Sequence, residues 1–327
     1  MVEWALDNGL NVKGHVLVWH VTSPKFLHDL SGDEFSAAVK SHIFSVMKHY
    51  KGKIKVWDVV NESLAPDGSL CQNIFFEKMG PSYIAQCFRW AHEADEAATL
   101  LYNDNKVEGW GLGEPHSDKA DGLFRLLKEL VEDGVPVHGV GLQAHFVASG
   151  TGVRRPPTPL AVANQIRRIG TLGLTVNLSE FDVRAGTTPL GPGDVDPSDA
   201  QTEIFRDILS ACFQQDNFTG VHFWGVADTV SWVEDFYGST DGPLILGDDF
   251  APKPAYYGVI DALASKRNPA SLASPCVLPD DFHDKTALVN DPWGRSSWMP
   301  PSPKSKKNDP AREEDTQNST KPDWELT

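Results

Sequence analysis

The chain has 327 residues and a mass of 35.9 kDa, and its 29 Lys and Arg against 45 Asp and Glu give a formal net charge of −16. Hydrophobic residues make up 40% and charged residues 23%, which is typical of a globular protein and excludes a wholly disordered or fibrous chain. Because an acidic protein repels phosphate backbones and anionic lipid, no nucleic-acid partner and no membrane partner is expected.

The four cysteines, Cys71, Cys87, Cys212 and Cys276, show no Cys-x-x-Cys spacing, so neither a zinc knuckle nor a disulfide framework is predicted. The eleven histidines form no His-Glu-x-x-His motif, and we expect no metal and no cofactor. No apolar run approaches the ~18 residues of a membrane span. The residues after Met1 lack the pattern of a signal peptide.

Six short apolar runs, rich in β-branched residues, are each followed by a longer amphipathic segment. In segments 117–132 and 202–213 the apolar positions have helical spacing. Apolar strands that alternate with helices are typical of a parallel sheet covered by helices. The predicted strands are Val12–Trp19, Ile54–Val60, Thr99–Tyr102, Val135–Leu142, Leu174–Phe181 and Gly220–Ala227.

Polar and aromatic residues cluster at the carboxyl end of almost every predicted strand. In a (β/α)8 barrel those ends meet at one mouth, where the loops build the active site. An open doubly wound sheet binds its ligand at one switch point instead, and no Gly-x-Gly-x-x-Gly follows any strand here. The pattern therefore favours the α/β class and a (β/α)8 TIM barrel. The clustered pairs are Trp19 and His20, Asn61 and Glu62, Asn103 and Asp104, Gln143 and His145, Glu180 and Asp182, and Trp224 and Asp228.

Six predicted strands are two fewer than a barrel needs, and the shortfall falls at the N-terminus. Residues 1–9 are predicted to be the end of a helix, with Gly9 as its C-cap, leading directly into the first strand. We therefore expect residues 1–263 to form an N-terminally truncated TIM barrel with about six of its eight βα units. Residues 264–327 are rich in proline and mixed charge, which is typical of a disordered tail.

Glu62 and Glu180 each stand at the end of an apolar strand, where a carboxylate is costly unless the site uses it. Glycosidic bond cleavage needs two such groups, because one protonates the leaving oxygen and the other attacks or activates water. A single strand-end glutamate is more often a cap or an ion-pair partner, but two on separate strands beside His, Asn or Trp favour catalysis. Trp19, Trp224 and Trp232 add surfaces on which the apolar faces of sugar rings stack.

Five strand-end segments, in this order along the chain, resemble glycoside hydrolase family 10, whose typical members are endo-1,4-β-xylanases. The resemblance covers about residues 1–263. It implies a retaining enzyme that hydrolyses internal β-1,4-xylosidic bonds of xylan without a cofactor. It also implies a secreted protein with a polysaccharide substrate, and we expect a monomer, although this chain shows no signal peptide. The segments are Gly14–His20, Trp57–Glu62, Gly139–His145, Val176–Arg184 and Trp224–Trp232.

By this resemblance, Glu62 matches the family's acid/base and Glu180 its nucleophile. Retention of configuration requires carboxyl groups about 5 to 5.5 Å apart and a covalent glycosyl-enzyme intermediate. Asn61 matches the residue that binds the sugar 2-hydroxyl, and His145 and Asp182 match a pair that orients the nucleophile. Contacts with the substrate are implied for His15, Trp19, His20, Gln143, Trp224 and Trp232.

The sequence also departs from the family pattern in places that affect substrate binding. Residues 21–26 lack the usual Ser-Gln pair and the Trp that follows it, and Asn105 stands where the family has an aromatic residue on the aglycone side. Two alternatives stay open. One is a catalytically silent or fragmentary carbohydrate-binding remnant of the same barrel, and the other is a retaining β-1,4-glucanase, which would keep both glutamates.

Overall fold

The computed structural model describes residues 1–150, 154–186, 196–238 and 241–266. Their core is a parallel β-sheet whose strands alternate with helices. The strands are β1 (Lys13–Gly14), β2 (Val18–Trp19), β3 (Val56–Asn61), β4 (Thr99–Asp104), β5 (Gly139–Leu142), β6 (His145–Val147), β7 (Thr175–Arg184) and β8 (Phe218–Phe223). Both β1 and β2 pair with β3, and both β5 and β6 pair with β7. The strands therefore occupy six positions in the order β1/β2, β3, β4, β5/β6, β7, β8.

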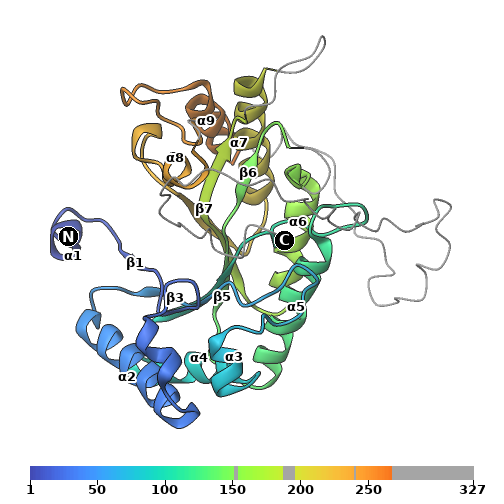
Figure 1. Cartoon of the computed structure of the whole chain (residues 1–327). Helices are drawn as coiled ribbons and strands as arrows, with labels where there is room; N and C mark the ends of the chain where they lie inside the picture. Colours follow the sequence, from blue (N-terminus) through green and yellow to red (C-terminus); the bar gives the residue numbers. More distant parts are fainter. Residues whose placement is uncertain (151–153, 187–195, 239–240, 267–327) are drawn as a thin grey trace, which may run out of the picture. The chain divides into compact units, whose positions relative to one another are not determined.

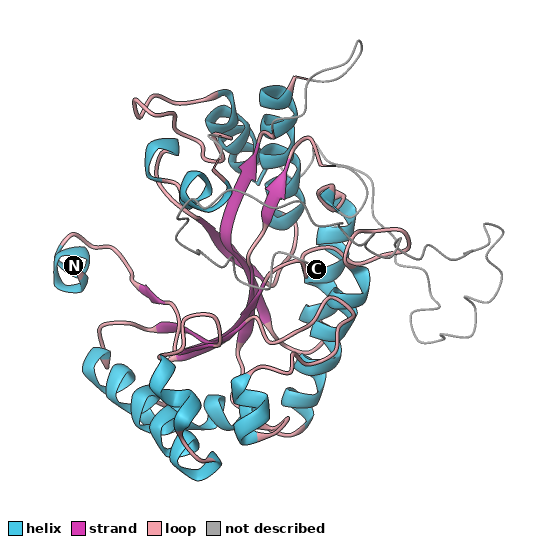
Figure 2. Ribbon diagram, viewed as in Figure 1, coloured by secondary structure: helices cyan, strands magenta, loops and turns pink. Residues whose placement is uncertain are grey.

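Most of the helices follow one another along the outer side of this sheet, while the N-terminal helix of residues 2–7 lies apart from them (Figure 1, Figure 2). Neighbouring helices pack together, as in the pairs α2 and α4, α5 and α6, α6 and α7, and α7 and α9. The helices are α1 (Val2–Asp7), α2 (Gly32–Tyr50), α3 (Ile74–Met79), α4 (Tyr83–Ala94), α5 (Ser117–Glu132), α6 (Pro159–Gly170), α7 (Pro197–Phe213), α8 (Trp232–Tyr237) and α9 (Pro254–Lys266). Within the described residues, no helix combines the length and the apolar character needed to cross a membrane.

Local sequence signals explain where these helices begin and which face they bury. At the start of α2, Ser31 and Glu34 form a capping box, in which each side chain accepts a hydrogen bond from the other residue's backbone N–H. At the start of α6, the Thr158 hydroxyl caps the helix and Pro159 supplies the fixed φ of the first turn. The buried face of α2 repeats every four residues, at Phe35, Val39, Ile43 and Met47.

The structure confirms the predicted parallel sheet and the helix at residues 117–132, and it places Gly9 after α1 with φ of 72°. Three strand predictions were too long, among them Gly220–Ala227, because β8 already ends at Phe223. Val12–Trp19 is divided into β1 and β2, and residues between them reach β3 through the bond from Leu17 N–H to the Asp58 carbonyl. In Val135–Leu142 the strand begins only at Gly139. Strand β6 was not predicted, because three residues are too few to show a period.

In the described residues the sheet is open. Strand β8 pairs with β7 alone, while β1 and β2 pair with β3 alone, so six of the eight positions of a TIM barrel are filled. This agrees with the strand count expected from the sequence. Helix α9 continues to Lys266, and residues 267–327 of the predicted tail lie outside the described residues.

Candidate active site

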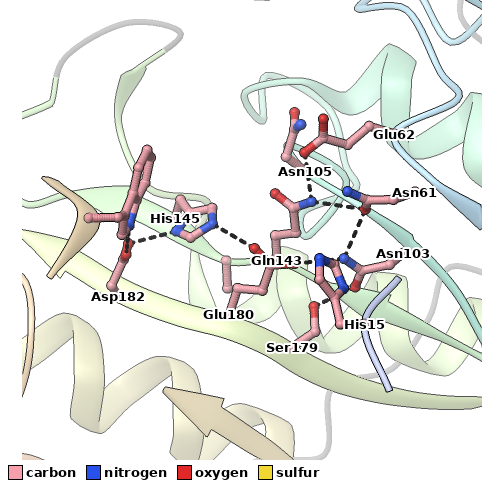
Figure 3. Close-up of polar contacts among 12 residues, drawn as sticks. His15, Asn61, Glu62, Asn103, Asn105, Gln143, His145, Ser179, Glu180 and Asp182 are labelled. Atoms are coloured by element: carbon pink, nitrogen blue, oxygen red, sulfur yellow. Dashed lines mark hydrogen bonds and ion pairs between the residues drawn. The ribbon is translucent and has the colours of Figure 1, made fainter. Parts of the chain in front are cut away.

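The polar residues that end the strands converge at the carboxyl edge of the sheet (Figure 3). They come from four neighbouring positions, β3, β4, β5/β6 and β7, whose carboxyl ends point the same way because all the pairings are parallel. In barrel folds this edge carries the active site. Both predicted glutamates lie here, and Gln143 lies between them (Figure 3).

Glu180 lies within β7, which continues to Arg184 and not only to the predicted end at Phe181, and Glu180 is 4% exposed. Its Oε1 accepts a hydrogen bond of 2.8 Å from Asn103 Nδ2, and its Oε2 lies 3.1 Å from His145 Nε2. The Glu180 backbone N–H bonds to the Gln143 carbonyl at 3.1 Å, which continues the pairing between neighbouring strands. Each carboxylate oxygen is therefore held by a nitrogen from a different strand, and the carboxylate is fixed in orientation.

His145 connects Glu180 to Asp182. Its Nδ1 lies 2.8 Å from Asp182 Oδ1, and Asp182 Oδ2 accepts a bond of 2.8 Å from Trp232 Nε1. Burial alone would lower the pKa of His145, but the Asp182 and Glu180 carboxylates outweigh it and raise the pKa to about 10. The ring is therefore an imidazolium near neutral pH and donates one N–H to each carboxylate.

We expect folding stability to depend on pH through His145. Its pKa rises from about 6.5 in the unfolded chain to about 10 in the fold. This contribution is fully present below about pH 6.5 and is lost as the pH rises through about 10. At pH 6 the His145→Gln protein should melt at least about 3 °C below the wild type. Scanning calorimetry should show this difference in melting temperature becoming smaller towards pH 10.

His49→Gln is the matched control, because His49 is exposed on the last turn of α2. The control should follow the wild-type curve of melting temperature against pH. A gap between His145→Gln and the wild type that stays constant from pH 6 to 10 would contradict the coupling of His145 to the two carboxylates.

Glu62 follows β3 and is half-buried. Its Oε2 accepts a bond of 2.8 Å from Trp19 Nε1, and its Oε1 accepts one of 2.9 Å from Gln143 Nε2. Its φ of 55° lies in the left-handed region that residues other than glycine seldom adopt. The turn at this residue ends β3 and leaves the carboxyl group at the edge of the sheet.

Side-chain amides connect the two glutamates. Asn61 Oδ1 accepts bonds from Asn103 Nδ2 at 3.0 Å and from Gln143 Nε2 at 3.2 Å. Asn103 also binds Glu180, and Gln143 also binds Glu62. The relative position of the two carboxyl groups is therefore set by three buried amides rather than by the backbone alone.

Sequence reasoning missed the roles of two residues in this network. Asn103 was noted at the end of its strand, but no role was assigned to it, and it bonds to Asn61 and Glu180. Ser179 donates from Oγ to Asn103 Oδ1 at 2.6 Å, which fixes the orientation of the amide. The strand-end position of Asn103 was the available signal, whereas nothing in the sequence distinguishes Ser179 from other strand serines.

Aromatic and histidine side chains border this network. Trp224 is 36% exposed, and its ring lies edge-on to the rings of His15 and His145, at centroid distances of 5.5 and 6.4 Å. His15 Nδ1 lies 3.0 Å from Asp58 Oδ2, which orients the ring. Trp232 packs against His145 at 5.1 Å. A partly exposed indole beside the histidine that holds Glu180 can stack on a sugar ring.

His20 is the predicted site residue with the weakest connection to the others. Burial lowers the pKa of His20, and the nearby Glu62 and Asp104 carboxylates oppose this shift. Its buried Nδ1 has no hydrogen-bond partner in the described part of the chain. Over the same residues, no group of three or more His, Cys, Asp or Glu side chains is arranged to hold a metal ion.

The family model described as glycosyl hydrolase family 10 matches residues 1–262 of the chain. Endo-1,4-beta-xylanase B of Thermotoga neapolitana is 32% identical over 267 residues, which cover 81% of this chain and 73% of that protein. Beta-1,4-xylanase of Dictyoglomus thermophilum is 34% identical over 270 residues, which cover 80% of this chain and 73% of that protein.

Solved structures give the same result. Native xylanase 10B from Thermotoga maritima superposes with a TM-score of 0.72 at 33% identity, over 81% of this chain and 78% of that chain. Xylanase 10B from Thermotoga petrophila RKU-1 in complex with xylobiose superposes with a TM-score of 0.71 at 34% identity, over 81% of this chain and 77% of that chain.

Proposed function

The chain belongs to glycosyl hydrolase family 10, and from this premise we propose that it is a retaining endo-1,4-β-xylanase. It hydrolyses internal β-1,4-xylosidic bonds of xylan by a double displacement at Glu62 and Glu180. The observation that carries the proposal is the pair of glutamates, one directly after β3 and one within β7, held in fixed relation by the amides of Asn61, Asn103 and Gln143. Two carboxyl groups at one site are what glycosidic bond cleavage needs, which supports this proposal.

In the first step Glu180 is the nucleophile. Its oxygen forms a bond to the anomeric carbon while the bond from that carbon to the leaving oxygen breaks. Glu62 gives its proton to the leaving oxygen, so the sugar leaves as a neutral alcohol. Asn103 and His145 hold the Glu180 carboxylate before it attacks, and Asn61 presents its amide to the sugar 2-hydroxyl, a contact that strengthens in the transition state.

In the second step Glu62, now ionised, takes a proton from water. The water oxygen bonds to the anomeric carbon and displaces the Glu180 carboxylate, which restores both glutamates and retains the configuration. Asp182 stabilises the His145 imidazolium throughout, so that His145 keeps an N–H directed at Glu180. Water is the co-reactant of the second step and supplies both its oxygen and its proton.

For the substrate we propose xylan, bound along the edge that carries Trp19, His15, His20, Trp224 and Trp232. The sugar rings stack on the indoles, and Gln143 and Asn61 supply polar contacts. The xylobiose complex of a relative that is 34% identical supports a β-1,4-xylose chain as the ligand. A polymeric substrate supports action outside the cell, and we propose that the protein acts as a monomer.

One observation favours a second candidate, a carbohydrate-binding protein without turnover. In the described residues the sheet is open between β8 and β1/β2, and these strands carry or precede Trp224, Trp19 and His15. The aromatic side chains beside this opening would bind a sugar ring even without turnover, whereas the two glutamates and their amides, which the first candidate needs, are held by strands that are fully paired.

Activity on polymers separates these functions. We expect reducing ends to form from xylan and not from carboxymethyl cellulose. Proton NMR at early times should show the β anomer first, because double displacement retains configuration. Binding of xylan without release of reducing ends would support the second candidate. Faster hydrolysis of cellulose would replace xylan by glucan as the substrate, and an α anomer at early times would overturn the double displacement.

A further inference from the structure

The chain turns sharply at Glu62, where φ is 55°. Three consecutive backbone amides at this turn are each held by a different residue of β4. These bonds fix the backbone that carries the Glu62 side chain. They join Glu62 N–H to the Asn103 carbonyl at 3.0 Å, Ser63 N–H to the Tyr102 hydroxyl at 3.0 Å, and Leu64 N–H to Asp104 Oδ2 at 3.3 Å.

Tyr102 and Asp104 lie on the opposite side of β4 from Asn103, because side chains alternate along a strand. The Tyr102 hydroxyl donates its proton to Asp104 Oδ2. From α5, Lys119 Nζ donates to Asp104 Oδ1 at 2.8 Å and to Asn105 Oδ1 at 3.1 Å. The Tyr102 hydroxyl therefore accepts a hydrogen bond from the Ser63 backbone N–H and donates one to the ion pair of Asp104 and Lys119.

This ion pair is buried. The side chain of Asp104 is 0% exposed and that of Lys119 is 6% exposed. Removing two charges from water is costly, so a buried pair is a weak source of stability and is better explained by the conformation that it specifies. Each oxygen of Asp104 accepts two hydrogen bonds. Oδ1 accepts from Lys119 Nζ and the Asn105 backbone N–H, and Oδ2 accepts from the Tyr102 hydroxyl and the Leu64 backbone N–H.

We propose that Tyr102, Asp104 and Lys119 are positioning residues that hold the turn at Glu62 so that its carboxyl group meets the leaving oxygen. The inference rests on the proposed role of Glu62 as acid and base. The three residues act from behind the sheet, through the amides of Ser63 and Leu64, and are not catalytic residues. Because a misplacement of about 1 Å can cost about 10²-fold in rate, the network matters for proton transfer.

Tyr102→Phe tests the proposal, because it removes one hydroxyl and keeps the ring. On xylan, kcat/KM should fall by at least about tenfold. On 2,4-dinitrophenyl β-xylobioside it should fall by less than about threefold, because this leaving group needs no proton. Lys119→Met should likewise lose more kcat/KM on xylan than on the dinitrophenyl substrate, since it removes the cation that pairs with Asp104. Equal losses on the two substrates, or no loss on either, would overturn the proposal.

Leu127→Ala is the matched control for a general loss of stability. Leu127 is fully buried on α5, two turns beyond Lys119, and belongs to the hydrophobic core. This variant should lower the melting temperature without touching the network, so the ratio of kcat/KM on the two substrates should stay at its wild-type value. If the losses of kcat/KM on the two substrates differed as much in Leu127→Ala as in Tyr102→Phe, destabilisation alone would explain the difference, and the proposal would be overturned.

Amide hydrogen exchange tests the network without turnover. In Tyr102→Phe the Ser63 amide loses its acceptor, and its exchange should speed up by at least about tenfold relative to the amides of β3. Unchanged exchange would overturn the network. A wild type that hydrolyses neither substrate would refute the proposed function, while the exchange measurement would still decide whether Tyr102 holds the turn.

Discussion

Replacing Glu180 by alanine should lower the hydrolysis of xylan by at least about 10⁴-fold, because the substitution removes the group that forms the covalent intermediate. The fold should persist. Asn103 and His145 lose one acceptor each, but Asn103 keeps its bonds to Asn61 and Ser179, and His145 keeps Asp182. Initial rates on xylan and a circular dichroism spectrum check both expectations together.

Azide should restore turnover of 2,4-dinitrophenyl β-xylobioside by Glu180→Ala. A small anion fits the space that the carboxylate leaves and attacks the anomeric carbon from the same side. The product is then the α-glycosyl azide, with inverted configuration. Glu129→Ala, at an exposed position on α5, is the control and should keep the wild-type rate without azide. Near wild-type hydrolysis of xylan by Glu180→Ala would show that another residue is the nucleophile.

The sheet could be predicted because its signals are local. Runs of β-branched and apolar residues are typical of buried parallel strands, and the capping residues of the helices stand in the sequence next to the elements that they begin. The bounds of the first strand were harder to predict. Its apolar run is continuous from Val16 to Trp19, but the chain leaves the ladder after Gly14, and no residue type marks that departure.

The site could be predicted as a set of strand ends but not as a network. Glu62 and Glu180 are recognisable because a carboxylate that ends an apolar strand is unusual. The bonds that relate them depend on register across β3, β4, β5 and β7, which no single segment contains. Lys119 shows this most clearly, because on the sequence it is one more charge on an amphipathic helix, yet its side chain is almost completely buried.

Glu62→Gln should affect substrates according to their leaving groups. On xylan, kcat/KM should fall by about 10² to 10⁴-fold, because the alkoxide must leave without a proton. On 2,4-dinitrophenyl β-xylobioside, kcat/KM should fall by less than about threefold, while kcat falls further, because the second step still needs a base. A burst of dinitrophenol before the slow steady state should report the trapped intermediate. Equal losses in kcat/KM on both substrates would contradict the role of Glu62 as the acid.

Glu62→Gln also changes the hydrogen bonds that the side chain makes with Trp19 and Gln143, so a control variant is needed. Glu62 accepts from both Trp19 Nε1 and Gln143 Nε2, whereas an amide can accept at one atom only and turns its NH2 towards the other donor. Gln143 can relieve this clash by turning its own amide, which sacrifices its bond to Asn61. Glu62→Ala avoids the clash, so a leaving-group split shared by both variants reports the lost proton and not the displaced amide.

Azide distinguishes the two glutamates by stereochemistry. In Glu62→Ala the first step with the dinitrophenyl substrate still forms the bond to Glu180, and azide then attacks the intermediate from the face where Glu62 stood. The product is the β-glycosyl azide, with retained configuration, in contrast to the α product of Glu180→Ala. Because double displacement requires the two carboxyl groups to act on opposite faces of the anomeric carbon, each variant should open one face only. The same anomer from both variants would refute the assignment of acid/base to Glu62 and nucleophile to Glu180.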